Sequence, residues 1–425
     1  MLKLKRKERR IAAWTQLQSG LAGKHPSNWN LTQQLHKSNA EQLHQELRFL
    51  LIICVIFGSA PISVLPRCSS RFYDVMQYCW LFLLYIWLCF LAYLELNDSS
   101  GILNNLERNF YIFESITYLM HIPCVVIVSL SWKRRIGQVF DTIGKFDLAS
   151  GYIVKRKKIR RFVHFQLFLL FIFVSCAIPI VFFNSDVTTW KSICSWHTYV
   201  VPNTMTGFSF VLYYTLMEGI CRRLKRLVKA LHAELQRGIS MRRGALQELR
   251  WQHRNLLHFY KVLNQTYGLS ILLLYSSSLI NFNTNLFLFY KAVENSSNAR
   301  WNWWCYNILF LIMHTSKMFY ILYFNNNVQR EQTNCLTLLT TVHGINGDLI
   351  ETIDHFVLQL QDNVRAHVAC DLFELDYKLI PAVFVRTFQS MLFSIILYIP
   401  AAHDNHQFIY ISTPIRCDIS STGSC

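Results

Sequence analysis

The stretch "HRNLLHFYKVLNQTYGLSILLL", residues 253–274, changes character halfway along, from a basic half to an apolar half. In and just before its first half, one set of side chains recurs at steps of three and four residues, which is the spacing of the packed face of a helix. These residues are Leu246, Leu249, His253, Leu256, Tyr260 and Leu263. The second half is apolar enough for hydrocarbon, and neither a Pro nor another helix stop separates the halves. The stretch therefore predicts one helix that runs from water into a membrane.

The composition of the whole chain is that of a membrane protein. Of 425 residues, 52% are hydrophobic and only 16% are charged, whereas soluble proteins carry about a quarter charged residues. Several apolar stretches approach the roughly 20 residues that a helix needs to cross hydrocarbon. They are the seven ranges 76–94, 110–130, 162–183, 198–217, 266–290, 303–324 and 378–399. We expect an all-α, polytopic membrane protein with seven transmembrane helices and cytosolic helical extensions.

One further apolar segment, residues 49–65, is shorter, carries Gly58 and Pro61, and is followed by Pro66. Because Gly and Pro interrupt helices, we expect an interfacial or re-entrant segment here, with a membrane span as the alternative. The expected organisation is a cytosolic N-terminal segment (1–48), the interfacial segment with the first four transmembrane helices (49–217), a cytosolic helical hairpin (218–262), the fifth and sixth transmembrane helices (263–324), a cytosolic anchor segment (325–377), the last transmembrane helix (378–399) and a C-terminal tail (400–425).

The orientation follows from two strongly basic segments, because short loops rich in Lys and Arg stay cytosolic. Residues 131–161 hold ten Lys or Arg against two Asp, and residues 218–261 hold eleven against three Glu. This places the N-terminus in the cytosol and the C-terminus outside. Glycosylation sequons at Asn97 and Asn295 then face outward, whereas those at Asn30 and Asn264 stay cytosolic and unmodified.

The cytosolic part is expected to contain three amphipathic helices. A second apolar stripe consists of Leu224, Leu227, Val228, Leu231 and Leu235. It matches the stripe between Leu246 and Leu263, so the fourth and fifth spans are expected to extend into the cytosol as a hairpin. Two separate helices lying on the membrane surface are the alternative. In "LIETIDHFVLQL" the third stripe is Leu349, Ile350, Ile353, Phe356, Val357 and Leu360. Its acidic opposite face is expected to dock on the basic hairpin.

Polar residues inside the predicted spans are the candidates for a ligand site, since they are costly in hydrocarbon unless they face the bundle interior. The candidates are Glu114, Thr117, Tyr118, His121, Tyr199, Thr204, Thr206, Asn281, Asn283, Asn285, Trp304 and Tyr306. Such a site suits a small organic molecule. For each residue the alternative is structural: the Trp and Tyr side chains form an interfacial belt, and each Asn bonds a neighbouring helix. Glu114 is the carboxylate well inside a span, and it counters a cationic ligand or pairs with His314 or Lys317.

The order of these motifs resembles the insect gustatory receptors. The similarity covers most of the chain and is most specific in "LNQTYG" and "LFELD". The matching residues are Leu263, Asn264, Tyr267 and Gly268 in the first motif and Leu372, Phe373, Leu375 and Asp376 in the second. The resemblance implies a tastant-gated cation channel in the plasma membrane of chemosensory neurons. It also implies a homo- or heterotetramer of related subunits in which cytosolic helices form a shared anchor and the last span lines one pore.

The last predicted span departs from the family's pattern of Thr-Tyr, five apolar residues and Gln-Phe. Thr387 and Phe388 imitate the first pair, but Ser394 and Ile395 stand where Gln and Phe belong, and a polar turn begins at Pro400. The pore positions that the resemblance implies are Phe388, Met391, Ser394, Ile395 and Tyr398. A splice variant, a gene-model error and genuine divergence are the alternatives for this ending, and we expect the chain to conduct poorly alone.

Enzyme chemistry finds no support in the sequence. There is no His-Glu-x-x-His motif, no phosphate-binding Gly loop and no Cys pair at metal-ligand spacing, so we expect no cofactor and no metal. The net charge of +17 lies beside the spans, which favours anionic membrane lipids over nucleic acid as the partner. A G-protein-coupled type of receptor is the alternative function, although its N-terminus would lie outside. A secondary transporter is the second alternative, although no internal repeat is visible.

Overall fold

The computed structural model describes residues 47–64, 71–98, 105–149, 156–182, 189–237, 243–294, 301–341, 347–362, 368–369 and 373–375, with the isolated positions 385 and 389. Apart from positions 385 and 389, the predicted last span at 378–399 lies outside the described residues, as do its five pore residues and Asn295, Leu372 and Asp376. The side chains of Tyr306 and Phe373 also lie outside them.

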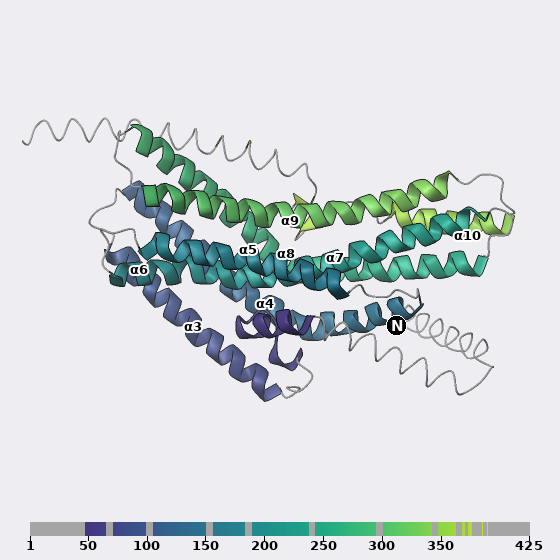
Figure 1. Cartoon of the computed structure of the whole chain (residues 1–425), viewed down its shortest axis with the longest axis horizontal. Helices are drawn as coiled ribbons and strands as arrows, with labels where there is room; N and C mark the ends of the chain where they lie inside the picture. Colours follow the sequence, from purple (N-terminus) through teal and green to yellow (C-terminus); the bar gives the residue numbers. More distant parts are fainter. Residues whose placement is uncertain are drawn as a thin grey trace, which may run out of the picture.

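The described chain is helical, which confirms the predicted all-α class (Figure 1). Its long helices lie roughly along one axis and form an elongated bundle. The helices are α3 (Arg71–Asp98), α4 (Asn105–Ala149), α5 (Arg156–Phe182), α6 (Thr189–Ser195), α7 (Val201–Leu235), α8 (Arg243–Glu294), α9 (Trp301–Thr340) and α10 (Gly347–Gln361), with the 3-10 helix η1 (Ile62–Val64) and the π-helix η2 (Trp196–Val200). Two short strands, β1 (Val368–Ala369) and β2 (Phe373–Glu374), pair antiparallel, with Val368 opposite Glu374.

The stretch at residues 253–274 lies wholly inside α8, a single helix of 52 residues. At 1.5 Å per residue this helix is about 78 Å long, more than twice the roughly 30 Å of a hydrocarbon core. The helix therefore continues far beyond the membrane, and its basic half belongs to the part that lies beyond the hydrocarbon core. The preceding helix α7 likewise runs on to Leu235 past its apolar part.

Four helical segments of the described chain are long and apolar enough to cross a membrane. They are Arg71–Asn97, Ile112–Ser131, Lys157–Pro179 and Ile308–Thr340. The predicted fourth and fifth spans belong to α7 and α8, which are more polar and lie in the centre of the bundle, where a helix needs fewer apolar side chains than at the lipid. The count of seven spans stays a prediction.

The outermost of these helices expose their apolar side chains. In α3, Trp80, Phe82, Trp87, Phe90 and Tyr93 are exposed, and only 22% of its apolar window is buried, against 50% for α9. Exposed apolar surface of this size is unfavourable in water and normal in lipid. The chain is accordingly a multi-pass membrane protein.

The segment at 49–65 contains a short helix, Leu47–Ile56, which at about 15 Å is half the hydrocarbon thickness. The chain then turns at Gly58, whose positive φ of 75° is unfavourable for any residue with a Cβ atom. Gln77 of α3 holds the turn, since its side-chain amide donates to the carbonyl oxygens of Val55 at 2.7 Å and Ala60 at 3.0 Å.

Helix α10 packs against α8 through apolar side chains, which corrects two expectations. The acidic face was expected to dock on the hairpin, but the apolar stripes are the buried ones: Phe356 and Leu360 are buried within this one chain, as are Leu256 and Leu263 of α8. Ile350 was expected in the buried stripe but is 47% exposed, because the buried face is narrower than the apolar one. The acidic face contributes one exposed ion pair with the hairpin, Arg243 to Glu351 at 3.8 Å.

Candidate functional site

A column of buried polar side chains runs between α4, α8 and α9, in the parts of these helices that contain predicted spans. On α4 it consists of Glu114, Tyr118 and His121, which share one face because they are spaced by four and three residues. Tyr118 and His121 are 1% exposed, whereas Glu114 is partly exposed. Polar groups at this depth must be paired or face a polar interior, so the partners of the column define the site.

Asn281 of α8 links Glu114 and Tyr118 of α4. Its side-chain Nδ2 donates to Glu114 Oε1 at 2.9 Å and to the Tyr118 hydroxyl at 2.7 Å. Its own Oδ1 accepts from Asn285 Nδ2 at 3.0 Å, and Asn285 Nδ2 also donates to the Asn281 carbonyl oxygen at 2.7 Å. Tyr118 of α4 and Asn281 and Asn285 of α8 therefore hold one another in fixed orientations around the Glu114 carboxylate.

His314 of α9 continues the network from Tyr118. Its Nε2 lies 3.1 Å from the Tyr118 hydroxyl, and its Nδ1 lies 3.2 Å from the Ser278 hydroxyl of α8. One helical turn further along α4, His121 Nε2 lies 3.1 Å from the Ser277 hydroxyl. Both histidines thus bridge to α8: His314 extends the network of Glu114, Asn281 and Tyr118, and His121 forms a separate pair with Ser277.

Aromatic rings surround Tyr118. Tyr199 stands edge-on to it at 5.6 Å and 90°, and Phe310 lies 6.4 Å away. The Tyr199 hydroxyl is 3.0 Å from Ser115 Oγ. Tyr199 belongs to the π-helix η2, a form that is rare and frequent at functional sites. The extra residue in this turn rotates the side chains that follow, so that Tyr199 reaches α4.

Lys317 occupies the inner end of the column and is not the partner of Glu114. Its Nζ donates to Asn203 of α7, at 3.3 Å to both the carbonyl oxygen and Oδ1. Within the described part of the chain, no Lys, Arg or His side chain is paired with Glu114. Of the alternatives for Glu114, the two ion pairs are therefore absent from these residues.

The remaining candidates lie elsewhere. Thr204 donates to the Val200 carbonyl oxygen of its own helical turn at 2.7 Å, which is a structural role. Asn283 is two residues from Asn281 and so lies on another face of α8. Trp304 is partly buried. No sequence pattern predicted Ser115, Ser278 or Phe310 as part of the site, although the spacing of Phe310, His314 and Lys317 marks one face of α9.

A second polar cluster joins α7, α8 and α9 nearer the hairpin, and it contains Asn264 of the first family motif. Tyr213 donates to Asn264 Oδ1 at 2.7 Å, Asn264 Nδ2 donates to Asn325 Oδ1 at 3.0 Å, and Asn325 Nδ2 donates back to the Tyr213 hydroxyl at 2.9 Å. Tyr260 also donates to Asn325 Oδ1, at 2.8 Å. Leu263, Tyr267 and Gly268 are buried beside this ring, and Leu375 of the second motif is buried in the same core. Because Asn264 is 0% exposed, it is inaccessible to glycosylation.

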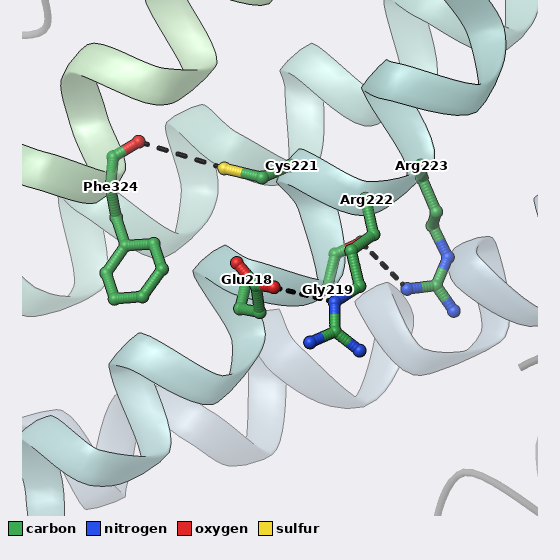
Figure 2. A network of polar contacts seen from close by, with 6 residues as sticks. All are labelled: Glu218, Gly219, Cys221, Arg222, Arg223 and Phe324. Atoms are coloured by element: carbon green, nitrogen blue, oxygen red, sulfur yellow. Dashed lines mark hydrogen bonds and ion pairs between the residues drawn. The ribbon is translucent and has the colours of Figure 1, made fainter. Parts of the chain in front are cut away.

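Charged residues on α7 follow directly after this cluster. Figure 2 shows Cys221 pointing toward the Phe324 carbonyl oxygen of α9, whereas Arg222 pairs with Glu218 of its own helix. Arg223 is buried and makes a bidentate pair with Asp147 of α4, at 2.7 and 2.5 Å. These contacts fix α7 between α9 and the far end of α4. Among the residues that the structure describes, no three His, Cys, Asp or Glu side chains could hold a metal ion.

The chain is similar in sequence to known proteins. The profile of a family described as "7tm Chemosensory receptor" matches residues 47–395. Two Drosophila melanogaster proteins named putative gustatory receptors, 59f and 59e, are similar in sequence. The first is 35% identical over 353 residues, which is 83% of this chain and 87% of that protein. The second is 25% identical over 132 residues, which is 31% of this chain and 33% of that protein.

Solved structures share the fold. The insect olfactory receptor OR5 from Machilis hrabei superposes with a TM-score of 0.63 at 13% identity, covering 83% of this chain and 98% of that one. The structure of the same receptor in complex with eugenol gives a TM-score of 0.65 at 12% identity, covering 84% of this chain and all of the other.

Proposed function

Because this chain belongs to the insect gustatory receptors of the 7tm chemosensory receptor family, we propose that it is one subunit of a tastant-gated, non-selective cation channel. The family is one of receptors rather than enzymes. We place the channel in the plasma membrane of chemosensory neurons, with the N-terminus in the cytosol. Glycans are then expected at Asn97 and Asn295, of which Asn97 is exposed at the end of α3.

The observation that carries this proposal is the buried column between α4, α8 and α9. A small tastant is proposed to contact Glu114, Tyr118, His121, Asn281 and Tyr199, which combine aromatic surface with a few fixed polar groups, as small-molecule sites do. Eugenol, the ligand of the olfactory receptor structure, is also a small aromatic molecule. Further contacts with Thr204, Asn283, Trp304 and Tyr306 stay predictions.

The channel itself is proposed to be a tetramer of this chain or of this chain with related subunits. The last span, residues 378–399, lines its pore with Phe388, Met391, Ser394, Ile395 and Tyr398. Because Ser394 and Ile395 replace the family's Gln and Phe, the unmodified chain is expected to carry little current alone.

Current recording on cells that express only this chain tests the function. Two versions are compared: the chain as written, and one in which the family's Thr-Tyr to Gln-Phe segment replaces the residues after Gln389. We expect tastant-evoked cation current that persists when G-protein signalling is blocked and is larger in the second version.

The pore assignment has its own control in the same cells. Tryptophan at position 394 or 395 (Ser394→Trp, Ile395→Trp) is expected to reduce the current because it narrows the pore. Large evoked current from the unmodified chain, unchanged by either tryptophan, would show that the last span does not line the pore. Current that requires G proteins would instead favour the metabotropic alternative.

A further inference from the structure

We propose that the ligand of this receptor is an organic amine, whose protonated ammonium group binds the Glu114 carboxylate between α4 and α8. The inference rests on the proposed ligand site and names the chemical class that this site selects. Glu114 is a carboxylate within a candidate membrane-spanning segment of α4, Ile112–Ser131.

An ionised carboxylate at this depth is unfavourable unless an opposite charge or several donors compensate it. In the described chain, Glu114 receives the Asn281 amide at 2.9 Å and is paired with no cationic side chain. The nearest buried cation of the column, Lys317, is bound to Asn203 instead. Glu114 is partly exposed, whereas Asn281 is 1% exposed.

The hydrogen-bond pattern beside Glu114 leaves acceptors rather than donors. The orientation of the Asn285 amide is fixed, because only its NH₂ group can face the Asn281 carbonyl oxygen at 2.7 Å. Its Oδ1 is buried and has no hydrogen-bond partner, and Asn285 is 3% exposed. The Asn285 amide oxygen therefore requires a donor and the Glu114 carboxylate of α4 can accept further ones, and an ammonium group supplies three.

Aromatic rings complete the surroundings of a cation. Tyr118 lies one turn from Glu114 on α4, and Tyr199 stands edge-on to it at 5.6 Å. Tyr199 is tied to Ser115, the residue next to Glu114, at 3.0 Å. Ring faces attract cations, and the combination of aromatic side chains with one carboxylate is characteristic of sites for organic ammonium groups. A neutral or anionic ligand would supply no positive charge to the Glu114 carboxylate.

The test measures binding without relying on current. The purified full-length chain in detergent is melted at neutral pH with phenylethylamine, butylamine or octylamine, each beside the alcohol of the same length. Primary amines are protonated at this pH. We expect an amine to raise the melting temperature at a concentration at least about tenfold lower than its alcohol, and Glu114→Gln to remove this preference, since a charge-assisted hydrogen bond contributes about tenfold to 100-fold in affinity.

Glu218→Gln is the matched control, because it removes a carboxylate of α7 that pairs with Arg222 away from the column. It should preserve the preference for amines. Equal stabilisation by amine and alcohol, no stabilisation by any amine, or a preference that survives Glu114→Gln each overturns the proposal. Because the unmodified chain is expected to carry little current, current is recorded from the version that carries the family's Thr-Tyr to Gln-Phe segment. In that version, amine binding without evoked current contradicts the channel function but supports this inference, whereas current evoked by alcohols alone does the reverse.

Discussion

Asn325 shows how single residues hold the interior of this protein together. Its side chain accepts from Asn264 and Tyr260 and donates to Tyr213, so three helices meet at one amide. All polar atoms of this ring that take part in these bonds are buried, and a buried polar group without a partner is destabilising by about 1–3 kcal/mol. The ring therefore stabilises the fold chiefly through what its removal would leave unpaired.

Removing Asn325 should consequently be worse than removing a peripheral member of the ring. We expect Asn325→Ala to lower the free energy of unfolding by about 2–4 kcal/mol, because Asn264 and Tyr260 both lose their acceptor, and Tyr260→Phe to lower it by about 1 kcal/mol. Thermal unfolding of the two purified variants checks the order. Equal melting temperatures would show that water replaces Asn325.

His253 gives the protein a pH dependence outside the membrane-spanning segments. It is 0% exposed, and burial lowers its pKa to about 4 from the ordinary 6.5. Because the unfolded chain binds the proton more tightly, stability is complete above pH 6.5 and is lost as the pH falls toward 4. Between pH 7.5 and pH 5 the loss should be about 2 kcal/mol.

The measurement compares melting temperatures at these two pH values for the wild type and for His253→Phe, which keeps a ring beside Phe356. The variant should lose less stability on acidification. The same loss in both proteins would assign the pH dependence to other groups.

Helices α8 and α10 stabilise each other through the contacts between them. The His253 ring lies 5.6 Å from the Phe356 ring, and Gln359 of α10 donates to His253 Nδ1 at 3.3 Å and accepts from Arg250 Nε at 3.2 Å. A helix of 15 residues is marginal alone in water, so α10 owes its stability to this packing.

Truncating Phe356 should release α10 from α8. We expect Phe356→Ala to lower stability by about 3–5 kcal/mol and to speed proteolytic cleavage within residues 347–361. His355→Ala, at the exposed neighbouring position, is the control and should change neither quantity by much. Unchanged cleavage in Phe356→Ala would mean that α10 is held by other contacts.

At the scale of the whole molecule, polar side chains gather in the centre of the bundle and apolar side chains cover its outer helices. The inner helices α7 and α8 carry the buried Asn, Ser and Tyr side chains, and the outer helix α3 presents aromatic residues to lipid. At the far end, beyond the membrane, α10 leaves Ile350 (47%) and Leu358 (57%) exposed. In the proposed tetramer these two apolar residues are available for contact with another subunit, whereas the buried stripes are not.

Charged residues at this surface should therefore weaken assembly and leave the subunit folded. We expect the double variant Ile350→Asp and Leu358→Asp to shift the particle from tetramer toward monomer, as measured by mass photometry in mild detergent, with an unchanged melting temperature of the subunit. Tetramers that persist in the double variant would place the main contacts elsewhere.

The sequence by itself determined the class of this protein. Hydropathy and residue spacing are local properties, so they predicted the all-α membrane fold and a helix running through residues 253–274, and the motifs around Asn264 and Leu375 identified the family. The tertiary structure alone decided which polar residues meet. Glu114 and Asn281 are 167 residues apart, and their pairing depends on how α4 and α8 are rotated against each other. The same reason explains why Ile350 is exposed although its spacing fits the buried stripe: spacing defines a face, but only packing against another helix decides how much of that face is covered.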